Sequence, residues 1–411
     1  MTRIGLRGAP CGEVDTSGVA HLDAQREPVR WWVAASDKWH DPRQSPSLRQ
    51  RAIDGTPVVE TKLAVPGGDI VHRAFAVADQ GGALVYEFEN RSPSAVVVAV
   101  PASDMATTAS AAGTAPIGVE SQGIDVPQHV RAFPLTHSSS ITFAWSLRRP
   151  RWRILRPQAT APMVAATLAG HAAVVRGWVQ ACEKASRVSI APHELTASRC
   201  AMLLATAHDL DALLHDDAAL GVLAIAERVR MGDPPEPWSA SVADAVQRIA
   251  RRPQASVWSW RALSAAAGFF MQADESDAAN DTVAAWQRSL DEQRAGNAGS
   301  PSTSRSADGL AGAVMHAANR EDLLVRPVSP SETQLFSDGL VNSRGANLEA
   351  HSVHAGPRHR VSLAVRWHGE NAALLWEVEG PPGLRLTAPA VDASFSTLAA
   401  QGEALLKVAT R

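Results

Sequence analysis

One short segment of the sequence, residues 30–41, concentrates groups that could bind a sugar. A flat indole can cover the apolar face of a pyranose ring, while carboxylates bind its hydroxyl groups, and ligand pockets generally combine apolar walls with a few fixed polar groups. The segment therefore predicts a saccharide site, formed by Trp31, Trp32, Asp37, Trp39 and Asp41. The alternative is that the three indoles fill a hydrophobic core or a domain interface.

A second group of aromatic and charged residues lies near the C-terminus and is predicted to contact the same kind of ligand. It consists of Arg366, Trp367, His368 and Glu377. Residues 361–367 alternate between apolar and polar, as in a strand, and residues 373–378 return as its partner. This pattern places Arg366 and Glu377 on one face of the hairpin. The alternative is a surface salt bridge between strands or a domain contact.

A third group, His208, Asp211 and His215, has the spacing of one helical face and could hold a metal ion. The apolar residues Leu210 and Leu214 mark the buried side of this helix, which leaves His208 on the opposite side. We therefore expect a solvated polar face here, and the sequence predicts neither a metal site nor a cofactor.

Paired acids for glycoside hydrolysis stand about 5–9.5 Å apart, a separation that a sequence does not supply. The candidates in the N-terminal half are Asp37, Asp41, Glu60, Asp69, Glu87 and Glu89. The sequence has no GxSxG elbow, no P-loop and no GxGxxG after a strand. No catalytic residue is assigned, and we expect a non-enzymatic protein more than an enzyme.

The elements that must position these residues follow a β, α, β order. Residues 1–157 carry short alternating runs separated by turn signals, which indicates an antiparallel β-sandwich. Residues 158–320 have helical periodicity, with a small, polar and flexible stretch at 295–307. Strand signals return in residues 321–411. The predicted fold class is α+β, with an N-terminal β-sandwich, a central α-helical domain and C-terminal β-strands.

Composition excludes several classes of protein. The 411 residues include 39 Lys and Arg against 42 Asp and Glu, and 45% are hydrophobic, so a disordered chain and a nucleic-acid binder with a basic field are not expected. The sequence has no signal-peptide core and no apolar run of membrane length, which predicts a soluble, cytoplasmic protein without a membrane partner. Three cysteines without a CxxC pair make a disulfide framework unexpected, and Cys182 and Cys200 are predicted to be buried as small apolar residues.

Several segments resemble an uncharacterised family of high-GC Gram-positive bacteria (actinobacteria), and the resemblance spans most of the chain. They are residues 30–37, 65–69, 89–93, 229–232, 364–369 and 373–377. The order of domains is also similar to that of glucoamylases, glycogen-debranching enzymes and disaccharide phosphorylases, which carry their acids in a toroid of twelve helices. Twelve helices need roughly 200 residues, and the helical segment here has about 160, so no catalytic residue is carried over.

Together these patterns predict a carbohydrate-binding or degenerate glycosidase-like protein with a saccharide as its partner. Two alternatives stay open. One is a glycoside hydrolase-like enzyme that uses acids from the N-terminal half, and the other is a non-enzymatic scaffolding or structural protein. The sequence does not indicate an oligomeric state.

Overall fold

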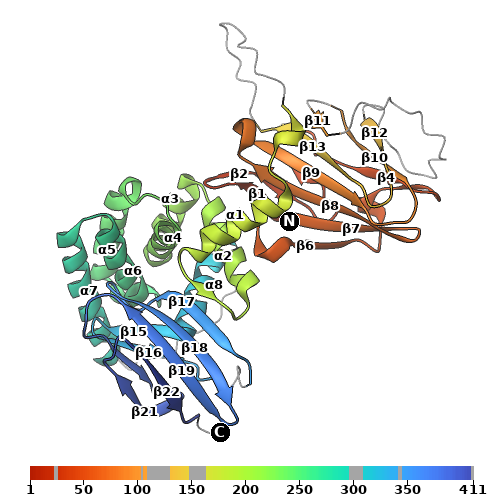
Figure 1. The fold of residues 1–411 in the computed structure, drawn as a ribbon. Coiled ribbons are helices and arrows are strands. Elements are labelled where there is room, and N and C mark those ends of the chain that lie inside the picture. Colours follow the sequence, from red (N-terminus) through yellow and green to blue (C-terminus); the bar gives the residue numbers. More distant parts are fainter. Residues whose placement is uncertain are drawn as a thin grey trace, which may run out of the picture. The chain divides into compact units, whose positions relative to one another are not determined.

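The fold is α+β, as predicted, and is shown by a computed structural model (Figure 1). The structure describes residues 1–22, 26–102, 105–108, 130–147, 163–295, 309–340 and 345–408. The chain divides into two compact units, Met1–Trp178 and Val179–Arg411, and the boundary falls within helix α1 (His171–Glu183). Apart from Ala295, the predicted flexible stretch at 295–307 lies outside the described residues.

The first unit is an antiparallel β-sandwich with a small additional sheet. The additional sheet has the order β1 (Thr2–Leu6), β2 (Ala9–Val14), β3 (Ala20–His21). One layer of the sandwich has the order β12 (Val130–Leu135), β10 (Val96–Pro101), β4 (Trp32–Ala34), β5 (Trp39–His40). The other layer has the order β11 (Met105–Thr107), β13 (Ser140–Ser146), β9 (Ala83–Asn90), β8 (Gly68–Val77), β7 (Val59–Val65), β6 (Arg49–Ala52).

Side chains that alternate along the strands form the core between the two layers, and β8 and the first half of β9 are buried on both faces. In β9 the predicted inward residues Leu84, Tyr86 and Phe88 are all fully buried, and they pack with Val98 of the opposite layer. The tight turn between β7 and β8 contains Gly67, whose φ of +81° suits glycine. Alternation and turn chemistry together therefore account for the sandwich.

A buried histidine lies in an aromatic cluster within this core. The ring of His72 is 4.8 Å from that of Trp31, 4.3 Å from that of Tyr86 and 4.8 Å from that of Phe88. His72 has no exposed surface, and neither of its ring nitrogens has a hydrogen-bond partner among the described residues. Burial, with a smaller contribution from the charge of Arg73, lowers the pKa of His72 to about 3. The imidazole is therefore neutral in the folded protein at physiological pH.

Replacing His72 by Phe should make the protein less sensitive to acid. Between pH 6.5 and pH 3 the unfolded chain binds a proton that folded His72 does not, so this residue reduces stability as the pH falls. Between pH 7 and pH 5 the contribution amounts to about 2 kcal/mol of unfolding free energy. Urea denaturation at both pH values measures how much the free energy of unfolding falls between pH 7 and pH 5. This fall should be smaller by that amount for His72→Phe than for the unchanged protein. An equal fall in both proteins would contradict a lowered pKa for buried His72.

The second unit contains a bundle of helices around a nearly fully buried helix. The helices are α2 (Pro192–Leu204), α3 (Ala207–Asp216), α4 (Ala218–Arg230), α5 (Ser239–Arg251), α6 (Ser259–Gln272), α7 (Ser276–Ala295) and α8 (Gly309–Leu324). Helix α4 is buried on all sides from Ala219 to Val229. Asp217 caps its start by accepting hydrogen bonds from the amides of Ala219 and Leu220. Gly221 allows the close approach of α3, because a Cβ atom there would lie 2.6 Å from the Cα of Leu214.

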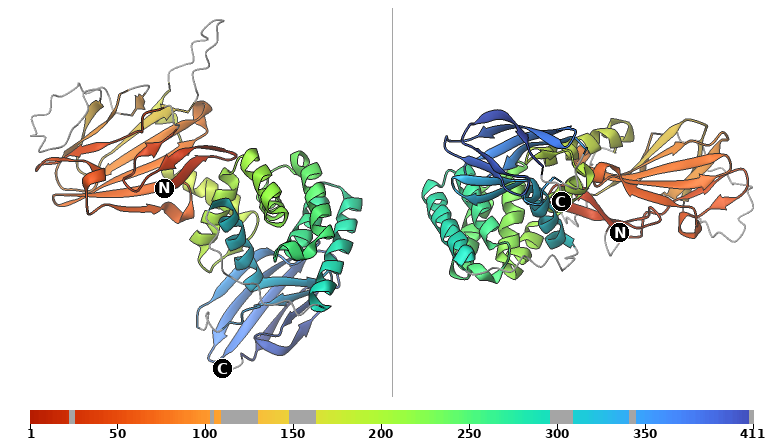
Figure 2. Two further views of the ribbon diagram at one scale, coloured as in Figure 1. Left: turned by 180° about the vertical axis from the view of Figure 1, so that it is seen from behind. Right: turned by 90° about the horizontal axis from the view of Figure 1, so that it is seen from below.

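Two sheets complete the second unit beside these helices (Figure 2). The first has the order β14 (Arg187–Val188), β17 (Leu348–His354), β18 (Arg360–His368), β19 (Asn371–Glu379), β22 (Gln401–Leu406). The second has the order β15 (Val325–Ser329), β16 (Glu332–Leu335), β20 (Arg385–Ala388), β21 (Asp392–Thr397) and includes one parallel pair, β16 with β20. The predicted hairpin is confirmed as β18 and β19, with Val361, Leu363 and Val365 on the buried face.

In the described part of the chain, no helix has both the length and the apolar character needed to cross a membrane.

Candidate functional site

The three tryptophans of residues 30–41 are buried in hydrophobic cores. Trp31 lies in the core between the sandwich layers with 1% of its surface exposed. Trp32 and Trp39, at 1% and 4%, pack together in a second cluster, and the guanidinium of Arg30 lies 4.7 Å from the ring centre of Trp32. Stacking on a sugar requires an exposed ring face, which none of the three indoles offers. Their burial removes the observation on which a saccharide site was predicted here.

The two aspartates of the same segment make local contacts. Asp37 is exposed and is bonded to Nε2 of His40 at 3.0 Å. Asp41 is buried and accepts hydrogen bonds from the backbone amide of Arg43 at 2.9 Å and from its Nη2 at 2.8 Å. Asp41 thereby caps the short 3-10 helix that begins at Pro42. These contacts stabilise the loop after β5.

The C-terminal group is spread over one end and one face of the β18–β19 hairpin. Arg366 and Glu377 lie on the same face, as predicted, but Arg366 is paired with Glu349 of β17, and Glu377 is opposite Ser362. Trp367 is half-buried and donates a hydrogen bond from Nε1 to the carbonyl of Ala346 at 3.0 Å. His368 is exposed where the hairpin turns. This group belongs to the second unit and the Trp31 group belongs to the first.

The acids considered for glycoside hydrolysis include two that are paired with arginines on one sheet. Glu60 accepts hydrogen bonds from Arg51 at 3.0 Å and Arg73 at 3.1 Å, and Glu89 accepts from Arg73 at 2.9 Å and Arg91 at 2.6 Å. Burial opposes ionisation of Glu60, but Arg51 and Arg73 outweigh it and lower its pKa, and the bond from Arg91 lowers the pKa of Glu89. A general acid must hold a proton near neutral pH, so neither group suits that role.

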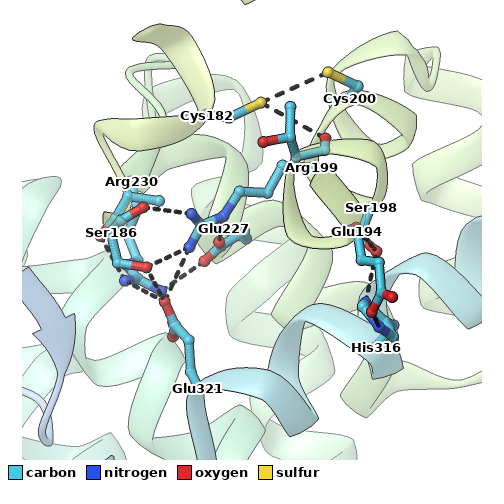
Figure 3. Close-up of polar contacts among 12 residues, drawn as sticks. Cys182, Ser186, Glu194, Ser198, Arg199, Cys200, Glu227, Arg230, His316 and Glu321 are labelled. Carbon is cyan, nitrogen blue, oxygen red and sulfur yellow. Dashed lines mark hydrogen bonds and ion pairs between the residues drawn. The ribbon is translucent and has the colours of Figure 1, made fainter. Parts of the chain in front are cut away.

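A carboxylate at the centre of a buried charge network was not found by sequence reasoning. Glu321 of α8, which is 2% exposed, is surrounded by three guanidinium groups. Its carboxylate is 3.0 Å from Nη2 of Arg199, 3.0 Å from both terminal nitrogens of Arg230 and 3.2 Å from Nη2 of Arg261. Ser186 also donates a hydrogen bond to it at 2.7 Å (Figure 3). Because Glu321 and the three arginines come from four separate helices, no local spacing could have revealed the group.

Two further carboxylates complete the network. Glu227 accepts hydrogen bonds from Nε of Arg199 at 2.7 Å and from Nη1 of Arg230 at 2.6 Å (Figure 3), and Asp322 is paired with Arg261. The network therefore contains three guanidinium groups and three carboxylates. Burial alone would raise the pKa of Glu321, but Arg230 and Arg199 hold it far below its usual range, so the carboxylate stays ionised.

A cavity of about 50 Å³ lies against this network. Its polar lining comes from Glu227, Arg230, Arg261, Glu321 and His354. Its apolar lining includes Met202, Leu223, Phe269 and Val314, and the exposed Gln272 at the end of α6 also contributes. The space is large enough to hold ordered water or a small ligand.

His354 of β17 connects the cavity to α6. Its Nε2 atom is 3.2 Å from Oγ of Ser264. Burial and the positive charges of Arg230 and Arg261 lower the pKa of His354 to about 3. The imidazole is therefore neutral at physiological pH and can donate or accept a hydrogen bond without adding charge.

Ser198, His316 and Glu194 form a group that resembles a Ser–His–acid triad in composition (Figure 3). Oγ of Ser198 is 3.0 Å from Nδ1 of His316, but the hydroxyl donates to the backbone carbonyl of Glu194 at 3.1 Å. Nε of Arg320 donates to Nε2 of His316 at 3.4 Å, which places the imidazole proton on Nδ1. In this assignment the imidazole does not accept the serine proton, and the contacts join α2 to α8.

The remaining candidates make no further site. His208, Asp211 and His215 are all exposed on α3. Among the residues that the structure describes, no group of three or more His, Cys, Asp or Glu side chains is arranged to hold a metal ion. Cys182 and Cys200 are buried, as predicted, with their sulfur atoms 3.7 Å apart (Figure 3).

Comparisons with protein-family models, with curated proteins and with solved structures give no match to this chain.

Replacing Glu321 by Gln should strongly destabilise the second unit. The change leaves three buried guanidinium groups against two carboxylates, and breaking a buried ion pair costs about 3–5 kcal/mol. Glu194→Gln is a matched control, because Glu194 also pairs with an arginine, Arg320, but is 56% exposed. Urea denaturation should show a large decrease in the free energy of unfolding for Glu321→Gln and a small decrease for Glu194→Gln. Decreases of equal size would contradict a central role for Glu321.

Proposed function

We propose that this protein binds a small molecule, and that the cavity beside Glu321 is its ligand site. The observation that carries the proposal is the combination of fixed charges and apolar walls around one space within the second unit. Ligand sites generally have this composition, with few polar groups that orient the ligand and apolar groups that exclude water. The two guanidinium groups that line the space, those of Arg230 and Arg261, are already held in place by carboxylates.

The energetics of the network also support this proposal. Three ion pairs in a protein interior carry a desolvation cost that well-packed apolar residues would not have. The ion pairs also hold the charged side chains in fixed positions. Side chains that are already fixed lose little entropy when a ligand binds. Strongly perturbed pKa values beside a cavity, such as those of Glu321 and His354, are typical of functional sites.

The proposal differs from the saccharide hypothesis. The proposed site lies in the second unit, whereas the tryptophan-rich segment at residues 30–41 belongs to the first, and the described lining of the site includes no tryptophan. The burial of Trp31, Trp32 and Trp39 agrees with the alternative that these indoles fill a hydrophobic core, and such a role is compatible with a ligand site elsewhere. We also propose a cytoplasmic location, because Cys11, Cys182 and Cys200 are free thiols, which reducing compartments maintain.

Adding a methyl group to the wall of the cavity should weaken binding. Gly268 of α6 lines the cavity, and a Cβ atom there would lie 3.7 Å from Cε1 of His354 and 3.6 Å from the carbonyl of Pro357, which are ordinary contacts. Gly268→Ala should therefore fold normally and lose ligand. The matched control is Gly177→Ala, also within a helix, where a Cβ atom would meet nothing within 4 Å.

The measurement is ligand-observed NMR with a panel of compounds of four to six non-hydrogen atoms. We expect at least one compound to bind the unchanged protein and Gly177→Ala, and to bind Gly268→Ala at least about tenfold more weakly. The proposal fails if no compound binds, or if Gly268→Ala binds as well as the control.

A further inference from the structure

We infer that the ligand of this cavity is uncharged and carries an oxygen atom that accepts a hydrogen bond. The inference rests on the proposed function and specifies the chemical class of its ligand. It is argued from the charge balance of the network, from the hydrogen-bonding state of His354 and from the apolar side of the lining.

The charge balance disfavours an ionic ligand. The carboxylates of Glu227, Glu321 and Asp322 face the guanidinium groups of Arg199, Arg230 and Arg261, so these six groups carry no net charge. Arg326 and Arg360 add positive charges that act on Arg261 and His354. A carboxylate or ammonium group in the cavity would compete with the existing ion pairs or remain without a partner of its own. Both outcomes carry the desolvation cost of an unpaired buried charge.

His354 supplies the donor that an uncharged ligand would use. Within the described part of the chain, the hydrogen-bond partner given for the hydroxyl of Ser264 is Nε2 of His354, at 3.2 Å. We assign the hydroxyl as the donor, because its proton then has an acceptor, and this assignment puts the imidazole proton on Nδ1. Nδ1 has no partner among the described residues, and the side chain lines the cavity. A donor N–H group at a cavity is best satisfied by an acceptor oxygen.

The opposite side of the lining favours a small hydrocarbon group. Leu223, Phe269 and Val314 offer apolar surface, against which a methyl or methylene group would be buried. The modest volume of the cavity favours a small ligand. A small amide or carbonyl compound combines these properties.

Three planar probes of equal size separate charge from shape. Acetamide, acetate and acetamidinium each have four non-hydrogen atoms and one methyl group, and they are neutral, anionic and cationic. We expect acetamide to bind the full chain at pH 7 at least about tenfold more tightly than either ion. A ligand of this size binds with a Kd no lower than about 40 µM. Protein-observed NMR titration up to tens of millimolar therefore covers the relevant range.

Two variants locate the binding. His354→Leu removes the donor and Gly268→Ala fills the space, and each should weaken acetamide binding at least about tenfold. His316→Leu is the matched control, because His316 lies on α8 and is not part of the cavity lining, and it should leave binding unchanged.

The outcomes separate this inference from the proposed function. Tighter binding of acetate or acetamidinium, weakened by Gly268→Ala, would overturn the uncharged class and leave the ligand site in place. Acetamide binding that neither variant weakens would place the compound outside the cavity and overturn the inference. If these probes and the wider panel all fail to bind, the proposed function itself is overturned.

Discussion

The second unit depends on one buried carboxylate, that of Glu321. It compensates guanidinium groups that reach it from α2, α4 and α6, and it accepts a hydrogen bond from Ser186 just after α1. Helices that carry buried charges can pack only where those charges are matched, so this carboxylate restricts how the four segments meet. The cavity lies beside two of these guanidinium groups, those of Arg230 and Arg261. The proposed ligand site therefore adjoins the contacts that join the helices.

Local patterns were sufficient to predict much of the fold. Alternation in residues 84–89 and 361–367 correctly predicted which residues of β9 and β18 face a core, because side chains on a strand alternate with a period of two. Helix ends depend on more than local capping patterns, since α5 begins at Ser239 without a side-chain cap. The cross-strand partner of Arg366 was also unpredictable, since Glu349 comes from a strand outside the hairpin.

The candidate site could not have been predicted in the same way. Arg199, Arg230, Arg261 and Glu321 are widely separated in the sequence, and each alone looks like an ordinary polar residue of an amphipathic helix. Their burial is a property of the bundle, in which α4 is surrounded on all sides. By contrast, Trp31, Trp32 and Trp39, which are close together in the sequence, fill two hydrophobic clusters of the first unit. Residue type alone does not distinguish an aromatic ligand surface from an aromatic core.

The central claim is that the cavity between the Glu321 network and His354 holds a small uncharged ligand. A crystal structure of the full chain soaked in acetamide tests it most directly. The account predicts density for the compound within the cavity, with its oxygen at hydrogen-bond distance from Nδ1 of His354 and its methyl group against Phe269. A well-ordered structure in which only water occupies the cavity at saturating acetamide would contradict it.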